Sequence, residues 1–313
     1  MNMPDTGLTV LWRGSLASCN YGCSYCPFAK TGDDREALAA DRRALERFEA
    51  WAASRAYKVS ILITPWGEAL IRNYYRQAIA RLSHAANVET IAVQTNLSCS
   101  LDWLEGCDLR KAALWTTYHP SETPRAAFLR KIEQLDAMGA RYSVGVVGLL
   151  EHLGEIEALH RDLPCGAYLW VNAFKRVADY YTQGQREQLI AIDPLFDLNN
   201  RDYQSKGRAC HAGETAISVI ADGTARRCHF LPAPIGNIYD ADFEAALRPR
   251  PCTAESCRCH IGYTHLKALD LRAVFGDGFL ERRPAGTPSR DDALRRIAQF
   301  DERRVSQVSS TGA

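Results

Sequence analysis

The sequence has no apolar run that approaches the roughly 20 residues of a membrane-spanning helix. Its first residues, Met-Asn-Met-Pro-Asp-Thr-Gly, carry neither the basic nor the apolar region of a signal peptide. Positive and negative charges balance, since 38 Lys and Arg stand against 37 Asp and Glu, which leaves a net charge of +1. Such a chain has no general attraction to nucleic acid or to an acidic membrane. We therefore expect a cytoplasmic protein with neither of these as a partner.

Low-complexity tracts and internal repeats are missing as well, and the composition excludes disordered, collagen-like and coiled-coil chains. Of the 313 residues, 46% are hydrophobic and 24% are charged, as in ordinary globular proteins. This length corresponds to about two domains at roughly 150 residues each. The chain is therefore long enough to bury a large core and to carry a second unit.

What the sequence does contain in unusual number is cysteine, with 11 residues. Because a reducing cytosol disfavours structural disulfides, so many thiols indicate metal binding or redox chemistry. Three of them, Cys19, Cys23 and Cys26, lie on one short segment. Five more lie in the last third of the chain: Cys210, Cys228, Cys252, Cys257 and Cys259. We interpret these two groups as ligand sets and the isolated cysteines as core residues: Cys99, Cys107 and Cys165.

Short apolar runs alternate with longer helical stretches over the first 180 residues. The predicted strands are 8–12, 58–63, 90–95, 112–118, 143–148 and 168–172. The predicted helices are 38–53, 73–86, 125–138 and 153–163. Six βα units of about 29 residues approach the roughly 31 residues per unit of an eight-stranded barrel. The pattern predicts an α/β fold, a partial (β/α)6 TIM-like barrel whose site lies at the carboxyl ends of its strands.

The rest of the chain divides by composition. We expect residues 1–180 to form the partial barrel and residues 181–206 to form a connection rich in turn-forming residues. Residues 207–283 hold the five later cysteines in a small unit that needs a metal to stabilise it. Residues 284–313 form a polar tail, with a charged helix over 289–304 and a frayed end.

The first cysteine group reads Cys19-Asn-Tyr-Gly-Cys23-Ser-Tyr-Cys26 and follows the first predicted strand. Three thiolates with the spacing C-x3-C-x2-C can hold three irons of a [4Fe-4S] cluster and leave the fourth iron open. This motif resembles that of the radical S-adenosylmethionine (radical SAM) superfamily. The resemblance implies that the open iron binds S-adenosylmethionine, whose reductive cleavage yields a 5′-deoxyadenosyl radical that abstracts hydrogen. Cys19, Cys23 and Cys26 are then the catalytic residues, while a zinc knuckle and core thiols are the alternatives.

The same resemblance implies further S-adenosylmethionine contacts. Thr64-Pro-Trp66-Gly67-Glu68-Ala69 stands where the family usually has Gly-Gly-Glu-Pro, so its backbone carbonyls and the Glu68 carboxylate are expected to contact the methionine ammonium. Trp66 and Ala69 depart from that pattern. Tyr25, just before the third cysteine, is expected to lie beside the adenine.

Polar residues end several of the predicted strands, as they do at the binding face of a barrel. Gln94-Thr95-Asn96 matches a Thr-Asn motif of the family, and Asn172 closes the sixth strand. Thr95, Asn96 and Asn172 are therefore candidate cofactor-binding residues, and His119 and Lys175 are weaker ones. Each could equally be a loop residue that satisfies its own backbone, and we expect Arg13 to be solvated.

The second cysteine group also follows a recognisable order. It comprises Cys210-x2-Gly213, Gly223-x4-Cys228, Ile235-Gly-Asn-Ile238 and Cys252-x4-Cys257-x-Cys259. These elements resemble the auxiliary-cluster extension of radical SAM enzymes, called SPASM or, in its shorter form, twitch. The resemblance implies a small C-terminal iron-sulfur domain over 207–283 with one auxiliary [4Fe-4S] cluster.

In that domain Cys210 and Cys228 are the firmest ligands, and Cys252, Cys257 and Cys259 compete for the two remaining places. Zinc is the alternative metal, because four cysteines alone do not separate zinc from iron and sulfur. Three histidines neighbour these cysteines and are expected by default to face solvent: His211, His229 and His260.

The resemblance covers about residues 8–283, and stretches such as Phe275-Gly-Asp-Gly-Phe-Leu resemble one bacterial subgroup of the superfamily. It implies an enzyme that takes electrons from a reductant such as flavodoxin or ferredoxin. Relatives with this extension often modify ribosomally made peptides. Since the chain starts directly at the first strand, we expect a separate protein or another groove to recognise a peptide substrate. Dehydrogenation or rearrangement of a small molecule, and a non-catalytic iron-sulfur carrier, are the alternatives.

Overall fold

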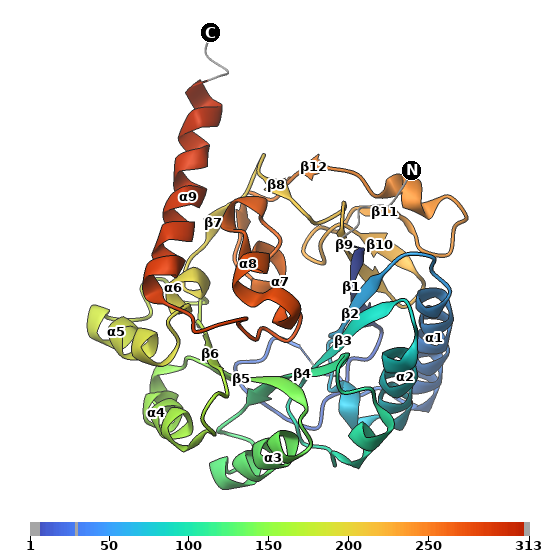
Figure 1. The fold of residues 1–313 in the computed structure, drawn as a ribbon, viewed down its shortest axis with the longest axis horizontal. Coiled ribbons are helices and arrows are strands. Elements are labelled where there is room, and N and C mark those ends of the chain that lie inside the picture. Colours follow the sequence, from blue (N-terminus) through green and yellow to red (C-terminus); the bar gives the residue numbers. More distant parts are fainter. Residues whose placement is uncertain (1–6, 29–30, 310–313) are drawn as a thin grey trace.

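The computed structural model describes residues 7–28 and 31–309, with side chains up to residue 302 (Figure 1). Residues 1–6 of the predicted barrel unit and residues 310–313 of the predicted frayed end lie outside the described residues. Within the described ranges, no helix combines the length and apolar character that crossing a membrane requires.

Six parallel strands form the centre of the sheet and confirm the predicted ones, with boundaries that differ by a few residues. They are β1 (Leu8–Gly14), β2 (Val59–Ile63), β3 (Val88–Thr95), β4 (Ala112–Tyr118), β5 (Arg141–Val147) and β6 (Leu169–Asn172). They pair in chain order, each parallel to the next. The strands are buried on both faces, which explains their continuous apolar runs.

The four predicted helices cover the outer face of this sheet (Figure 1). They are α1 (Arg35–Ala53), α2 (Asn73–His84), α3 (Arg125–Ala137) and α4 (Leu153–Asp162). The Asp34 side chain caps α1 by accepting a hydrogen bond from the Ala37 amide. Phe48 of α1 stacks on Trp12 of β1, with ring centroids 4.3 Å apart. Apolar residues at three- and four-residue spacing therefore pack as the periodicity predicted.

The sheet continues beyond β1 into the later part of the chain. β9 (Ala216–Ile220) pairs parallel with β1, and β10 (Thr224–Arg226) and β11 (Pro234–Asn237) add antiparallel strands. The result is a curved sheet of nine strands in the order β11-β10-β9-β1-β2-β3-β4-β5-β6. Residues 207–283 thus contribute three strands to the sheet of the barrel, a pairing that strand patterns alone do not reveal.

The segment 181–206, predicted as a turn-rich connection, is largely helical. It contains α5 (Gln183–Ile192) and α6 (Phe196–Asn199), and Thr182 and Gln185 form a capping box at the start of α5. Leu189, Ile190 and Ile192 are buried, and α5 contacts β6. The prediction was wrong here because five polar residues in the first six positions of α5 obscure its short apolar stripe.

The last part of the chain fills the inner side of the curved sheet, where Figure 1 shows α7 and α8. The helices are α7 (His260–Tyr263), α8 (Leu271–Phe275) and α9 (Arg290–Ser309). Their buried residues pack with inward residues of the strands, including Leu11, Trp115 and Trp170. The predicted charged helix is confirmed, but α9 continues to Ser309, beyond the predicted start of fraying at residue 305.

Short elements complete the fold. β8 (Ala209–Cys210) pairs with β12 (Arg250–Pro251), and β7 (Tyr203–Gln204) pairs with β13 (Ser256–Cys257). Single 3-10 turns lie at Ala69–Ile71, Asp102–Gly106, Leu150–His152, Phe243–Ala246, Lys267–Leu269 and Gly276–Gly278. The two small sheets bring Cys210 and Cys257 onto strands near the inner side of the large sheet.

His265 lies in this inner layer and predicts a pH dependence of stability. Its side chain is 4% exposed, and its Nδ1 atom has no hydrogen-bond partner. Burial, followed by the nearby Arg272 and His211, lowers the pKa of His265 to about 3. Below the ordinary histidine pKa of about 6.5, the unfolded chain binds a proton that the folded chain does not, so stability falls as pH decreases from about 6.5 towards 3.

We therefore expect His265→Leu to lose less stability than the wild type between pH 7 and pH 5, with a difference of up to about 1.4 kcal/mol per pH unit below pH 6.5. Urea denaturation at several pH values measures the free energy of unfolding. His160→Leu, on the exposed side of α4, controls for the loss of one histidine. Parallel curves for wild type and His265→Leu would contradict a neutral buried His265.

Candidate functional site

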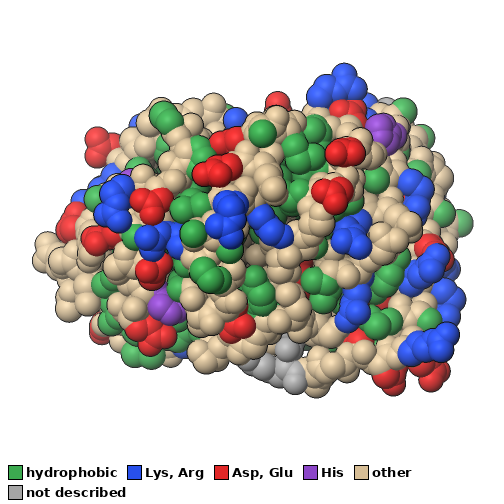
Figure 2. Space-filling model, turned by 90° about the horizontal axis from the view of Figure 1, so that it is seen from below, with side chains coloured by type: hydrophobic (Ala, Val, Ile, Leu, Met, Phe, Trp, Pro, Cys, Tyr) green, Lys and Arg blue, Asp and Glu red, His purple; other side chains and the backbone are tan. Residues whose placement is uncertain are grey.

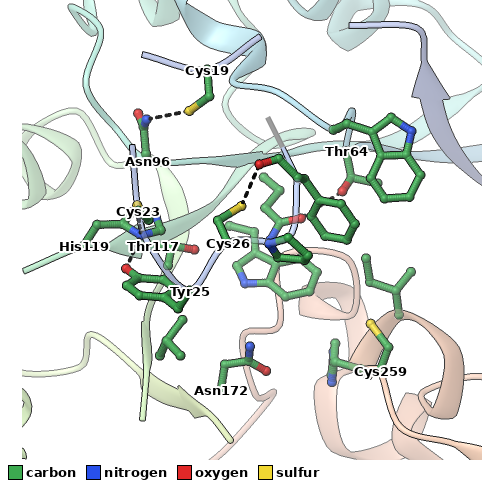
Figure 3. A pocket seen from close by; sticks show the side chains of 18 of the residues that line it. Cys19, Cys23, Tyr25, Cys26, Thr64, Asn96, Thr117, His119, Asn172 and Cys259 are labelled. Carbon is green, nitrogen blue, oxygen red and sulfur yellow. Dashed lines mark hydrogen bonds between the residues drawn. The ribbon is translucent and has the colours of Figure 1, made fainter. Parts of the chain in front are cut away.

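A cavity of about 390 Å³ lies at the carboxyl ends of the barrel strands (Figure 3). Ten predicted site residues line it: Cys19, Cys23, Tyr25, Cys26, Trp66, Gly67, Glu68, Thr95, Asn96 and Asn172. Residues for which we expected smaller or other roles line it too: Arg13, His119, Lys175, His229, Cys259 and His260. The loops after β1, β2, β3 and β4 thus converge on one space, together with the segment after β6 and the start of α7.

The first cysteine group lies on the loop between β1 and α1. The Asp33 carboxylate anchors this loop by accepting hydrogen bonds from the amides of Ala17 (2.9 Å) and Ser18 (2.7 Å). The Cys19 thiol accepts a hydrogen bond from the Tyr21 amide at 3.4 Å, and the Cys26 thiol donates to the carbonyl oxygen of Phe28 at 3.5 Å. Figure 3 shows the three motif thiols around the cavity wall, each next to a different neighbour.

The three thiols suit an iron-sulfur cluster in kind, since soft sulfur ligands favour such clusters, zinc or Cu(I). They are not arranged as a closed ligand set: among the described residues, no group of three or more His, Cys, Asp or Glu side chains is placed to hold a metal ion. Burial raises the pKa of Cys23 to about 11, and it also raises the pKa of Cys19. Because a ligating thiol must lose its proton, binding of a cluster would release protons here.

The loop after β2 lies directly on the cysteine loop. The Gly67 and Glu68 amides donate to the carbonyl oxygens of Leu16 and Ser18, each at 3.1 Å. A Cβ atom at Gly67 would lie 1.9 Å from the Ser18 carbonyl oxygen, so only glycine permits this approach. The motif glycine therefore fixes the distance between the two predicted S-adenosylmethionine loops.

Glu68 connects this loop to the end of β3. One carboxylate oxygen accepts hydrogen bonds from the Leu70 amide (3.0 Å) and the Thr95 hydroxyl (2.8 Å), and the other accepts from the Asn96 amide (2.7 Å). Glu68 is 4% exposed, and burial raises its pKa against the effect of these donors. The carboxylate oxygen that accepts only the hydrogen bond from Asn96 can accept a further one. The predicted contact with a methionine ammonium is compatible with this geometry and stays a prediction.

Asn96 connects the end of β3 to the cysteine loop. Its side-chain nitrogen, Nδ2, donates to the side-chain oxygen of Asn20 at 3.0 Å and lies 3.8 Å from the Cys19 sulfur (Figure 3). Its side-chain oxygen accepts from the Ser98 amide at 3.0 Å. Asn96 therefore supplies a hydrogen-bond donor to the first motif thiol.

Tyr25 and His119 form a partly buried pair beside Cys23. The Tyr25 hydroxyl lies 2.7 Å from the His119 Nδ1 atom, and the Cys23 sulfur lies 3.4 Å from the same atom. Burial lowers the pKa of His119 to about 4, against the opposing charge of Glu122. His119 is therefore neutral near pH 7 and more closely tied to the cysteine loop than we expected, while adenine contact by Tyr25 stays a prediction.

Two basic residues behave differently from expectation. Arg13 was expected to be solvated, but it is 4% exposed and lines the cavity. Burial lowers the pKa of Arg13 to about 10, so it remains charged near neutral pH. Lys175 donates to the carbonyl oxygens of Asn199 (2.7 Å), Arg201 (3.2 Å) and Arg258, so it holds neighbouring backbone in place. Burial lowers the pKa of Lys175 to about 8.

The five later cysteines lie near one another, although they come from separate segments. Burial, followed by repulsion from the other four thiols, raises the pKa of Cys257; burial also raises the pKa of Cys228 to about 11. Gly262 packs against the Cys257 sulfur, which a Cβ atom would approach to 2.8 Å. Cys259 is the member of this group that lines the large cavity. The structure does not choose between Cys252, Cys257 and Cys259 as ligands.

The histidines beside these cysteines do not face solvent, as we had expected by default. His211 and His229 are partly buried, and His260 is 6% exposed. Burial lowers the pKa of His229 to about 3, and the His260 ring nitrogen lies 3.1 Å from the Tyr263 hydroxyl. The expectation was wrong because all three segments lie against the inner side of the sheet.

Of the isolated cysteines, two follow the prediction. Cys99 is buried, and Cys107 is partly buried against the core. Cys165 is exposed, so its assignment to the core was wrong. It lies in the turn between α4 and β6, where no apolar periodicity supported burial.

Further polar residues point into the cavity from the strands below the loops and were not predicted as site residues. The Thr64 hydroxyl accepts a hydrogen bond from the Arg13 guanidinium at 3.1 Å and donates one to the Gln94 side-chain oxygen at 2.8 Å. Trp115 and Thr117 also line the cavity from β4. Strand alternation could have found them, because Leu11 and Arg13 share one face of β1.

Comparisons with protein-family models and with curated proteins find no match. Solved structures do match over nearly the whole chain. The structure of anSMEcpe with bound AdoMet (S-adenosylmethionine) has a TM-score of 0.51 at 12% identity, covering 97% of this chain and 99% of that chain. The same protein with AdoMet and the Cp18Cys peptide has a TM-score of 0.53 at 13% identity, with the same coverage.

Streptococcus suis SuiB bound to S-adenosylmethionine has a TM-score of 0.51 at 14% identity, covering 77% of this chain and 66% of that chain. At these identities the likeness is one of fold. The predicted α/β fold, a partial barrel that is open on one side, is therefore confirmed.

The close approach at Gly67 generates a prediction for the site. We expect Gly67→Ala to lower the free energy of unfolding by about 1–3 kcal/mol, because the added methyl group meets backbone that must shift. Urea denaturation measures this change. Gly22→Ala is the matched control on the cysteine loop, since a Cβ atom there meets nothing within 4 Å. Equal stability of the two variants would show that the loops do not depend on this contact.

Proposed function

We propose that this protein is a radical S-adenosylmethionine enzyme. The observation that carries the proposal is that the three cysteines of the C-x3-C-x2-C motif line one cavity together with Glu68 and Asn96, at the carboxyl ends of six parallel strands. Ligand sites in parallel α/β folds occupy this position. The fold shared with anSMEcpe and SuiB, both solved with S-adenosylmethionine, supports the proposal.

A [4Fe-4S] cluster on Cys19, Cys23 and Cys26 would supply the electron that cleaves S-adenosylmethionine to a hydrogen-abstracting 5′-deoxyadenosyl radical, after reduction by a protein such as flavodoxin or ferredoxin. The chain itself positions the reactants. Glu68 holds the end of β3 against the loop after β2, which orients the backbone that would bind the methionine part. Asn96 donates towards the Cys19 sulfur.

Side chains at the mouth of the cavity would exclude water from the reaction. Phe28 packs on Trp66 with ring centroids 4.4 Å apart, and the Arg13 guanidinium lies 3.9 Å from the Trp66 centroid. A reactive radical requires such shielding, since an open site permits side reactions. Asn172 faces the same space (Figure 3) and is positioned to hydrogen-bond a bound molecule.

For the later cysteines we propose one auxiliary [4Fe-4S] cluster, with Cys210, Cys228 and two of Cys252, Cys257 and Cys259 as ligands. The mutual proximity of the five thiols supports it. The division into a barrel unit over 1–180 and an auxiliary unit over 207–283 belongs to this proposal, as does a cytoplasmic location. The auxiliary cluster would bind substrate or accept an electron, because Cys259 lines the large cavity.

We propose a peptide as the substrate. The structure of anSMEcpe with AdoMet and a bound peptide supports a peptide in this fold. Exposed aromatic side chains at the mouth give a peptide apolar surface to contact: Phe28 is 40% exposed and Phe230 is 52% exposed. Aromatic residues are frequent at such contact surfaces.

The motif cysteines can be tested together. Replacing Cys19, Cys23 and Cys26 by Ala should remove about four irons per chain, because a [4Fe-4S] cluster contains four. Formation of 5′-deoxyadenosine from S-adenosylmethionine under dithionite should be abolished. Iron analysis and chromatography of the anaerobically reconstituted protein measure both. Cleavage at wild-type rate in this variant would refute the assignment of the site.

The later cysteines are tested by the double variant Cys210→Ala with Cys228→Ala. It should lose the auxiliary cluster, about four irons per chain, and destabilise residues 207–283, while the first cluster stays intact. Cys165→Ala, at an exposed isolated thiol, is the matched control. Iron content equal to that of the wild type would instead indicate zinc or free thiols.

A further inference from the structure

Positively charged side chains outnumber negatively charged ones in the described lining of the cavity. Among the described residues, its lining contains three cationic side chains, Arg13, Lys175 and Arg176, and one carboxylate, that of Glu68. The Glu68 carboxylate already accepts three hydrogen bonds from its own chain. The Lys175 ammonium already donates hydrogen bonds to backbone carbonyl oxygens. Arg13 is the buried cation among them that no acidic group balances.

Arg13 reaches the cavity because of strand alternation. Trp12 packs outward against α1, whereas Leu11 packs into the inner cluster of the sheet. Arg13 follows on the same inner face as Leu11, one layer closer to the carboxyl end of β1. It is therefore held by a rigid strand and not by a loop.

The contacts of Arg13 leave one nitrogen of its guanidinium, Nη2, for a ligand. Nη1 donates to the Thr64 hydroxyl at 3.1 Å, and the flat face lies over Trp66. Nε is buried with no hydrogen-bond partner, and Nη2 donates to no group of the described residues. None of the ion pairs between described residues includes Arg13. Nη2 is therefore the donor that remains for an oxyanion in the cavity, with which it would form a charge-assisted hydrogen bond.

Arg13 shares the cavity with Cys259 and His229. The Trp66 ring lies 3.9 Å from the Arg13 guanidinium and meets His229 edge to face at 6.3 Å. Glu68 and Asn96, which we assign to the methionine end, lie towards Cys19. A buried charge without a partner is costly and is retained where a ligand compensates it.

We propose that Arg13 binds a carboxylate or phosphate group of the substrate, so that the enzyme selects anionic substrates. This rests on the proposed function, because the oxyanion belongs to the molecule that the radical attacks. Thr64 and Gln94 position the guanidinium through a hydrogen-bonded chain that runs from β1 across the ends of β2 and β3. Trp66 covers it and keeps the oxyanion away from water.

Calorimetry with inorganic phosphate as the probe tests the subsite on reconstituted protein loaded with S-adenosylmethionine. The wild type should bind phosphate saturably, and Arg13→Gln should weaken binding by about tenfold or more, as loss of charge-assisted hydrogen bonds predicts. Arg47→Gln is the matched control, because Arg47 also lies over an aromatic ring, that of Tyr239, but on the exposed side of α1. Equal affinity of the wild type and Arg13→Gln, or no saturable binding by the wild type, would overturn the subsite.

Thr64→Val provides a second, less disruptive variant. It leaves the guanidinium in place but removes the hydroxyl that orients it, so phosphate binding should weaken severalfold while iron content stays unchanged. Unchanged phosphate affinity in this variant would contradict the positioning by Thr64.

The affinity for S-adenosylmethionine separates the two possible sources of the oxyanion. If Arg13 binds the substrate, Arg13→Gln should change this affinity by less than about twofold. A loss of about tenfold would assign Arg13 to the carboxylate of S-adenosylmethionine and overturn the proposal. Formation of 5′-deoxyadenosine by the wild type is measured in parallel. Absence of this product refutes the radical enzyme, whereas absence of phosphate binding by the wild type, with the product still formed, refutes only the subsite.

Discussion

The site depends above all on the close contact between the cysteine loop and the loop after β2. Gly67 lies against the Ser18 backbone at a distance that no side chain permits, and Glu68 holds the end of β3 through two hydrogen bonds, from Thr95 and Asn96. These bonds join the ends of three parallel strands into one wall of the cavity. Because the strands are rigid, the motif thiols are positioned by the sheet and not only by their own loop.

The last part of the chain completes the site from the other side. It packs apolar residues against the inner face of the sheet and returns Cys259 and His260 to the cavity that the first cysteine group lines. Through β9, the same region pairs with β1, the strand that precedes the cysteine loop. The two cysteine groups are therefore linked through one continuous sheet, which brings two distant segments of the chain to a single space.

Much of the barrel could be predicted from the sequence, because buried parallel strands read as apolar runs and outer helices show regular periodicity. The cysteine loop and the Gly67-Glu68 turn were equally visible, since their chemistry is local. The pairing of β9 with β1 and the helical nature of α5 could not be predicted, because the first is a long-range contact and the second hides its apolar stripe among polar residues. Arg13, His229 and His260 were misjudged for a related reason, since their burial depends on segments that are remote in sequence.

The most direct test of the central claim is the product formed when anaerobically reconstituted wild-type protein is reduced with dithionite in the presence of S-adenosylmethionine. The account predicts 5′-deoxyadenosine, from protein that contains about eight irons per chain in two clusters of four. Protein with its iron content restored that forms no 5′-deoxyadenosine would contradict it and would favour a non-catalytic iron-sulfur carrier.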